Sequence, residues 1–289
     1  MSSLLLLLTL AAAAARRPEA VVVRTVENMY SAPSADKDVV SQATLGQVVT
    51  ALERKAGFVK IETPDTYQGW LPAAALLEYP GPRALRYAAK GEVLEVVSLM
   101  AHIYRDPSAT SARPKARAPM GARLEIAGAP VSERWLRVRL PNGDSGFIQA
   151  GDVKRVDAAA SRPRGSEADL VSTARRFLGV PYLWGGMTAQ GLDCSGLTSL
   201  VYRVNGIEVL RDADMQFADP RLEPVEKGDL RPGDLVFFGK KGDEITHVGM
   251  FVGTGRFISA TVHGAPVVQE SGLDEPYWAE LYKGARRPR

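Results

Sequence analysis

The sequence predicts an α+β protein in which two small β-barrels precede a C-terminal domain of helices packed on an antiparallel sheet. Two strand-rich stretches in the first half share one pattern, and residues 166–285 combine helical spacing with alternating strands. The length of 289 residues suffices for two or three domains. Apolar residues make up 45% and charged residues 24% of the chain, a globular composition that excludes disordered and fibrous classes.

Residues 1–17 are predicted to be a signal peptide. The apolar run over residues 4–15 is too short to cross a bilayer, which needs about 20 residues, but it has the length of a signal-peptide core. A frayed N-terminal helix is the alternative interpretation. No second apolar run is long enough to span a membrane, so we expect an exported protein, periplasmic or extracellular, without a transmembrane span.

An internal repeat covers residues 18–80 and 88–157. Equivalent positions recur at a nearly constant offset, as in the pairs Tyr30 and Tyr104, Gly46 and Gly121, and Gly69 and Gly146. Each stretch contains short strands rich in Val and aromatic residues between Gly, Pro and Asp, which predicts a barrel of about five strands. The Tyr-x-x-Pro start, the Gly-led strand and the closing Gly-Trp or Gly-Phe pair resemble bacterial SH3 domains.

Charge and metal-ligating residues narrow the function classes. The net charge of +3 is too small to indicate a nucleic-acid partner. The stretch from Pro107 to Arg123 contains four cations and no acid, so it is either a solvated loop or a contact for an anionic polymer. One cysteine and three histidines exclude a disulfide framework and four-cysteine zinc sites, and we expect neither metal nor cofactor.

A linker at residues 158–166 leads into the C-terminal domain, residues 167–289. Ser166 and Asp169 have the spacing of a capping box, and the helix that they begin is expected to end at Gly179. A second helix is expected to begin at Cys194, with Asp193 as its N-cap, and to stop at residues 205–206.

The cysteine is a candidate nucleophile because of its place in the first helical turn. Helix N–H groups stabilise a thiolate there, although the charge of Asp193 opposes this and makes a partner base necessary. His247 begins an alternating strand over residues 247–253, whose hairpin mate is residues 256–261. A cysteine on a helix N-terminus that faces a histidine on an antiparallel sheet is the papain-like arrangement of nucleophile and base.

Five ordered blocks resemble one family. They are Pro-Tyr-x-Trp-Gly-Gly at 181–186, Asp-Cys-Ser-Gly-Leu at 193–197, Arg-Asp-Ala-Asp-x-Gln at 211–216, Pro-Gly-Asp-Leu-x-Phe-Phe at 232–238 and His-Val-Gly-Met-Phe-Val-Gly at 247–253. Together they are similar to the NlpC-type papain-like cysteine peptidases, which cleave bacterial cell-wall peptides. With two SH3-like domains in front, the chain resembles the subgroup that cuts the γ-D-glutamyl–diamino-acid bond of peptides with a free N-terminal L-Ala.

The resemblance implies roles for individual residues. Cys194 is the nucleophile, His247 is the general base, and the aromatic block places Tyr182 and Trp184 in the substrate cleft. Asp193 and Ser195 match the residues that hold the substrate ammonium. In the subgroup the first SH3 domain adds a carboxylate and a tyrosine to the cleft, for which the corresponding residues here are Asp38 and Tyr67.

The third polar residue of the family is usually a histidine on the strand paired with that of the base, and the matching position in this chain is Ser259. A three-residue loop at 252–254 predicts that Ser259 lies directly opposite His247, where it orients the ring weakly or through a water. His263 has the same face parity but lies about 13 Å farther along an extended strand. It serves instead only if the strand bends, so Ser259 and His263 both stay open.

The sequence therefore predicts a cysteine endopeptidase that hydrolyses the γ-D-glutamyl bond to L-Lys or diaminopimelate in murein peptides. Cell-wall remodelling and murein recycling are both compatible with this activity, and the basic loop is a candidate contact for an anionic cell-wall polymer. A weakened or inactive wall-binding protein on the same fold is the alternative, which Ser259 motivates. An acyltransferase or amidase on the same fold is a third option.

Overall fold

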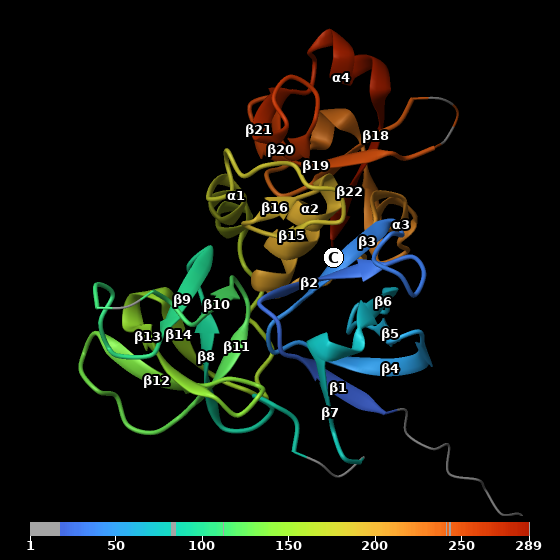
Figure 1. Ribbon diagram of the computed structural model, residues 1–289. Coiled ribbons are helices and arrows are strands. Elements are labelled where there is room, and N and C mark those ends of the chain that lie inside the picture. The colour runs from blue at the N-terminus through green and yellow to red at the C-terminus, as the bar shows by residue number, and fades with distance from the viewer. Residues whose placement is uncertain (1–17, 82–84, 112, 241, 243, 289) are drawn as a thin grey trace, which may run out of the picture.

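The computed structural model describes residues 18–81, 85–111, 113–240, 242 and 244–288. The predicted signal peptide lies outside these residues. Two β-rich parts sit side by side below the C-terminal part, which carries the helices (Figure 1). Within the described residues no helix has the length and apolar character that a membrane crossing requires.

The first β-rich part is a seven-stranded sheet in the order β3-β2-β6-β5-β4-β1-β7. Its strands are β1 (Glu19–Val22), β2 (Val26–Tyr30), β3 (Val39–Thr44), β4 (Val48–Lys55), β5 (Phe58–Glu62), β6 (Gln68–Pro72) and β7 (Leu76–Glu78), with a 3-10 turn at Ala73–Ala75. Alternate residues of these strands point inward and form a separate core around Met29, Ile61 and Leu71. The predicted β character of this stretch is confirmed.

The second β-rich part repeats this topology strand for strand, in the order β10-β9-β13-β12-β11-β8-β14. Its strands are β8 (Glu92–Val96), β9 (Met100–Tyr104), β10 (Ala116–Pro119), β11 (Arg123–Ile126), β12 (Trp135–Arg139), β13 (Ser145–Gln149) and β14 (Val153–Asp157), with a 3-10 turn at Ala150–Asp152. Gly46 and Gly121, which the repeat pairs, have φ angles of 80° and 82°. Both turns therefore need the left-handed conformation that glycine adopts most readily.

The basic stretch before β11 is partly neutralised by the chain itself. Lys115 forms an ion pair with Asp144, and Arg123 forms one with Glu95. Arg117 remains exposed on β10. The contact with an anionic polymer stays a prediction and rests on fewer cations than the sequence suggested.

The C-terminal part is a six-stranded antiparallel sheet with helices packed against it. The helices are α1 (Glu167–Arg175), α2 (Cys194–Val204), α3 (Ala213–Ala218) and α4 (Pro276–Leu281), with a 3-10 turn at Lys227–Asp229. The sheet has the order β17-β22-β18-β19-β20-β21, and β15 with β16 forms a separate ribbon. These strands are β15 (Met187–Thr188), β16 (Gly191–Leu192), β17 (Leu222–Val225), β18 (Leu235–Phe238), β19 (His247–Gly253), β20 (Arg256–Thr261), β21 (Val267–Gly272) and β22 (Tyr282–Pro288).

Local sequence explains where α1 and α2 begin. Ser166 accepts a hydrogen bond from the backbone N–H of Asp169, and the Asp169 carboxylate accepts one from the N–H of Ser166, which completes a capping box. Asp193 caps α2 by accepting from the N–H of Gly196. Both predicted helix starts are confirmed, and the second one fixes the position of Cys194.

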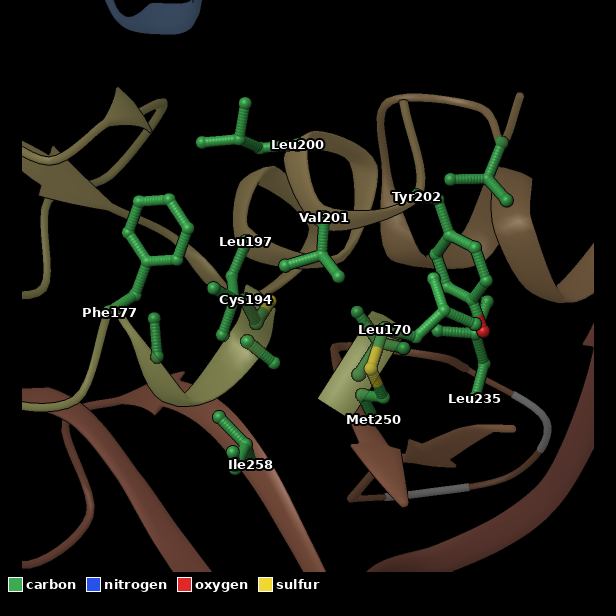
Figure 2. Packing of buried hydrophobic residues seen from close by; sticks show 14 of the residues in the cluster. Leu170, Phe177, Cys194, Leu197, Leu200, Val201, Tyr202, Leu235, Met250 and Ile258 are labelled. Carbon is green, nitrogen blue, oxygen red and sulfur yellow. The ribbon is translucent and has the colours of Figure 1, made fainter. Parts of the chain in front are cut away.

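Helix α2 packs on β19 and β20 through one continuous core. Leu197, Leu200 and Val201 of the helix meet Met250 and Ile258 of the strands. Figure 2 shows Cys194 at the start of the helix among these apolar side chains. Close packing of this kind fixes the helix N-terminus against the sheet, so the cysteine has a defined position relative to the strand that begins at His247.

Candidate active site

Cys194 is the first residue of α2, and only 9% of its surface is exposed. The backbone N–H groups of Val248 and Ser195 act on this side chain, since both lower the pKa of its thiol. Burial, together with the charge of Asp193, raises the pKa of the thiol to about 11 against the opposing effect of those N–H groups and Arg211. The resting side chain is therefore a thiol, and a base is needed to form the nucleophile.

His247 begins β19, one residue before Val248, whose N–H group lowers the pKa of the thiol. Its ring stacks on Trp278, with centroids 5.1 Å apart and planes at 26°, and its centroid lies 5.8 Å from that of Phe238. Nε2 is buried and has no hydrogen-bond partner within the described residues. Burial lowers the pKa of the imidazole to about 4, so at neutral pH the ring is uncharged and able to accept a proton.

The aromatic block before the cysteine lies at the same site. Tyr182 is half-buried, and its pKa is raised to about 12 by burial and by the nearby charges of Cys194 and Asp193. The phenol therefore keeps its proton and remains a hydrogen-bond donor beside the sulfur. Trp184, by contrast, is 68% exposed and leaves a broad apolar face open to solvent.

Asp193 and Ser195 lie in a buried network centred on Arg211, whose side chain is 1% exposed. Arg211 donates to Asp193 at 2.7 and 3.1 Å, to the hydroxyl of Ser195 at 2.9 Å and to the hydroxyl of Ser41 at 2.9 Å. Asp193 also accepts from the N–H of Gly185 at 2.9 Å. The polar atoms of Asp193 and Ser195 are thus engaged within the protein. Their role as ammonium ligands stays a prediction.

The first β-rich part forms one wall of the site. The hydroxyl of Tyr67 donates to the carboxylate of Asp212 at 2.9 Å, and the amide of Gln42 on β3 accepts from the backbone N–H of Met187 at 3.0 Å. The side chain of Asp212 is 39% exposed. Its partial burial raises the pKa of the carboxyl group. An accessible carboxylate thus lies between the two parts, next to Arg211.

Asp38 lies at the margin of this wall. It is exposed and directly precedes β3, whose first residue Val39 lies so close to Gly185 that a Cβ there would approach Val39 Cγ1 to 2.8 Å. Gly185 also has a φ of 75°, so this turn requires glycine on both counts. The position of Asp38 is compatible with its predicted role, which stays a prediction.

Two family models match the chain. The NlpC/P60 family model matches residues 179–287, and the model for the bacterial dipeptidyl-peptidase Sh3 domain matches residues 29–76. A gamma-D-glutamyl-L-lysine dipeptidyl-peptidase of Bacillus cereus is 32% identical over 262 residues, which cover 86% of this chain and 74% of that protein. The chain belongs to the NlpC/P60 family.

Two further similarities agree with this membership. The crystal structure of an NlpC/P60 family protein from Bacillus cereus matches with a TM-score of 0.81 at 25% identity, covering 93% of this chain and 99% of that chain. A murein DD-endopeptidase of Escherichia coli is 33% identical over 153 residues, which cover 52% of this chain and 54% of that protein. The predicted α+β fold and the cysteine peptidase class are confirmed, and the Sh3 model matches the first of the two β-rich parts.

Ser259 does not lie directly opposite His247, where the sequence predicted it. The turn between β19 and β20 has two residues, Thr254 and Gly255, with φ angles of 50° and 70°, and Met250 pairs with Ile258. Continued along the strands, this register sets Thr261 opposite His247, and Ser259 is only a diagonal neighbour. The expected three-residue loop was wrong, because the two positive φ angles allow a tighter turn, and an irregularity between Phe251 and Gly253 shifts the register by one residue.

Neither candidate for the third polar residue is bonded to His247. The Ser259 hydroxyl is fully buried without a hydrogen-bond partner among the described residues. The ring of His263 stacks on Tyr277 at 3.7 Å and meets the edge of Trp278 at 5.5 Å. Trp278 contacts both histidine rings, and together with Phe238 it packs against His247 in this structure.

Three residues of the site had no assigned role in the sequence. Arg211 and Asp212 stand in one of the blocks that mark the family, and an arginine next to an aspartate gives no sign that one is buried and the other accessible. Trp278 lies well beyond His247 in the sequence and is brought to it by α4. No group of three or more metal-ligating side chains is assembled in the described parts of the chain.

Proposed function

We propose that this protein is a cysteine endopeptidase that hydrolyses the γ-D-glutamyl–diamino-acid bond of murein peptides with a free N-terminal L-Ala. The observation that carries the proposal is the buried thiol of Cys194 against the strand that begins with the neutral imidazole of His247. The similarity to a gamma-D-glutamyl-L-lysine dipeptidyl-peptidase over most of the chain supports the choice of bond.

The proposed reaction uses Cys194 as the nucleophile and His247 as the base, in agreement with the directions of their pKa shifts. His247 accepts the thiol proton as the sulfur of Cys194 attacks the γ-carbonyl carbon, and the imidazolium then donates that proton to the nitrogen of the leaving diamino acid. The C–N bond breaks and an acyl-enzyme thioester remains. His247 next takes a proton from water, whose oxygen attacks the thioester. The C–S bond breaks, the γ-D-glutamyl product leaves, and the imidazolium returns the proton to the sulfur of Cys194. The phenol of Tyr182 donates a hydrogen bond to the carbonyl oxygen as negative charge develops.

Asp212 is the residue that we assign to the substrate ammonium. Its carboxylate is accessible, it already faces Tyr67 of the first β-rich part, and Asp193 is occupied by Arg211. A hydrogen bond between an ammonium and a carboxylate contributes roughly 1.5–3 kcal/mol. Selection of a free N-terminus thus comes from the junction of the two parts.

Replacing Asp212 by asparagine tests this assignment. With L-Ala-γ-D-Glu-diaminopimelate, kcat/KM is expected to fall by roughly 10- to 150-fold, because one charged hydrogen bond is lost. On the N-acetylated peptide, the slow hydrolysis by the wild type and by Asp212→Asn is expected to be equal. Steady-state kinetics on both peptides gives the four values needed.

The matched control is Asp214→Asn, two positions away and exposed on α3, which is expected to behave as the wild type. Equal losses on the free and the acetylated peptide in Asp212→Asn would show that Asp212 does not bind the amine. Acetylated peptide cleaved as fast as free peptide by the wild type would remove the whole claim of N-terminal selection.

The support of His247 by Trp278 predicts a change in pH dependence. Water reaches the ring in Trp278→Leu, so the pKa of His247 is expected to rise from about 4 toward its usual 6.5. Since the neutral imidazole is the active form, the acid limb of kcat/KM moves upward in pH by the same amount. Ser259→Ala is expected to keep the wild-type profile and a kcat within about threefold, because the Ser259 hydroxyl makes no hydrogen bond with a described residue.

The profile distinguishes positioning from folding, because a variant that merely unfolds in part loses activity at every pH alike. Trp278→Phe retains an aromatic face and should restore most of the wild-type profile. If Ser259→Ala lowers kcat tenfold while Trp278→Leu leaves the acid limb unmoved, Ser259 and not Trp278 holds the ring.

The organisation of the chain extends the proposal. We propose that residues 88–157 are a second SH3-like domain, since their strand order is the same as that of the first sheet, and that residues 1–17 direct export to the periplasm or the cell exterior. Residues 18–80 and 167–289 are then the SH3 and catalytic domains that build the substrate cleft. In this arrangement the enzyme meets murein peptides outside the cytoplasm.

A further inference from the structure

A cavity of about 330 Å³ lies where the three parts of the chain meet, away from Cys194 and His247. Residues 44–48 of the first sheet line one side, residues 121–123 of the second sheet line another, and the C-terminal half of α2 closes it. This volume is in the range of small-molecule binding sites. The proposed peptidase reaction makes no use of the cavity.

Three arginines from three different segments face this cavity. Arg123 lies on β11, Arg162 lies in the linker before α1, and Arg203 lies on α2. The acids on the lining are Asp65 and Glu208, so the lining has one net positive charge. A cluster of cations from separate parts of the fold is costly unless anions neutralise it.

Two of these arginines already share a single acid outside the lining. Glu95 lies 2.9 Å from Arg123, 2.8 Å from Arg162 and 3.2 Å from Lys154. Burial alone would raise the pKa of Glu95, but the attraction of these cations lowers it. One carboxylate therefore serves three cations, and Nε of Arg162 is buried without a correctly oriented hydrogen bond.

Arg203 is the cation without a partner. Its guanidinium forms no hydrogen bond or ion pair with any described residue, and Glu208 is exposed to solvent. Burial and repulsion by Arg162 lower the pKa of its guanidinium, and Asp65 offsets this only in part. Asp65 itself accepts a hydrogen bond from the hydroxyl of Thr63. The donors of Arg203 thus face a cavity with no acceptor assigned to them.

We propose that this cavity is a second ligand site, which binds the oxyanion of a small phosphorylated or carboxylated molecule between Arg203 and Arg162. A planar guanidinium donates paired hydrogen bonds to phosphate and carboxylate oxygens, which a lysine cannot do. The bound anion removes the repulsion between the two arginines. It also joins α2, the linker and both sheets, so its occupancy stabilises the arrangement of the three parts.

Binding is tested on the full-length protein with two probes, inorganic phosphate and glutarate, at constant ionic strength. Isothermal titration calorimetry and thermal unfolding are measured for the wild type, Arg203→Gln and Arg176→Gln. Arg176 is the matched control, because it is an exposed arginine at the end of α1 and remote from the cavity lining. Binding to the wild type is expected to be saturable for at least one probe.

The Arg203→Gln variant is expected to bind that probe at least about tenfold more weakly, while Arg176→Gln binds as the wild type does. Without ligand, Arg203→Gln should unfold at the wild-type temperature or above, because an unpaired cation is removed. Tighter binding of phosphate indicates a phosphorylated ligand, and tighter binding of glutarate indicates a carboxylated one. Absence of saturable binding with both probes, or equal binding by Arg203→Gln, overturns the proposal and leaves the peptidase proposal untouched.

Discussion

The Cys194→Ala variant is expected to lose hydrolysis of L-Ala-γ-D-Glu-diaminopimelate by at least ~10⁴-fold in kcat at neutral pH. No other cysteine exists in the chain, so no neighbouring thiol can replace the nucleophile. His247 and the phenol of Tyr182 would remain in place and would support only slow attack by water. Initial rates of amine release at equal enzyme concentration measure the loss.

Alkylation supplies an independent reading of the same site. Iodoacetamide is expected to modify one thiol per wild-type chain and to inactivate in step with labelling, faster as the pH rises toward the thiol pKa of about 11. Ser199→Ala, a small change on the same helix, should label and hydrolyse normally. A wild-type protein that binds the peptide and neither cleaves it nor loses binding on alkylation would be the wall-binding protein instead.

Residues with local signals could be predicted from the sequence, and residues with only long-range signals could not. The capping pair at Ser166 and Asp169, the N-cap at Asp193 and the strand at His247–Gly253 depend on neighbours within a few positions, and each was predicted correctly. The hydrogen bond between Tyr67 and Asp212 joins residues 145 positions apart. Nothing near Asp212 in the sequence predicts which domain will lie against it.

The register of the β19–β20 hairpin shows how a small local difference moves a candidate residue. A loop of three residues and a turn of two give the same pair of strands, yet they place different residues opposite His247. In the structure the turn consists of Thr254 and Gly255, both at a positive φ, which is uncommon for threonine, and the register shifts by one residue between Phe251 and Gly253. A pattern of alternating residues determines the face of the strand, and the turn determines the register.

The internal repeat, by contrast, could be predicted from a few equivalent residues in the sequence. A nearly constant offset between equivalent glycines and aromatics was enough to predict duplicated strands, and the two sheets have the same strand order. The insertions that change the offset fall between strands, where length varies at little cost in stability. Strand order is therefore the same in the two sheets although their strands and loops differ in length.

The Asp193→Ala variant is expected to be destabilised by roughly 3–5 kcal/mol, because removal of one partner leaves the buried charge of Arg211 uncompensated. Arg211 is 1% exposed and donates two of its hydrogen bonds to Asp193, at 2.7 and 3.1 Å. Loss of the N-cap of α2 adds about 1 kcal/mol. The midpoint of thermal unfolding should therefore fall by at least ~6 °C.

An exposed ion pair of nearly the same length is the control for this prediction. Lys227 and Asp274 lie 2.8 Å apart, and the Asp274 side chain is 82% exposed, so Asp274→Ala should cost less than about 1 kcal/mol. In the double variant Asp193→Leu, Arg211→Met, part of the lost stability should return, because no unpaired charge stays buried. Equal unfolding midpoints for Asp193→Ala and Asp274→Ala would show that Arg211 finds water or another acceptor. The contribution of Asp193 to stability would then be small, and its pairing with Arg211 would no longer argue against a role in binding the substrate ammonium.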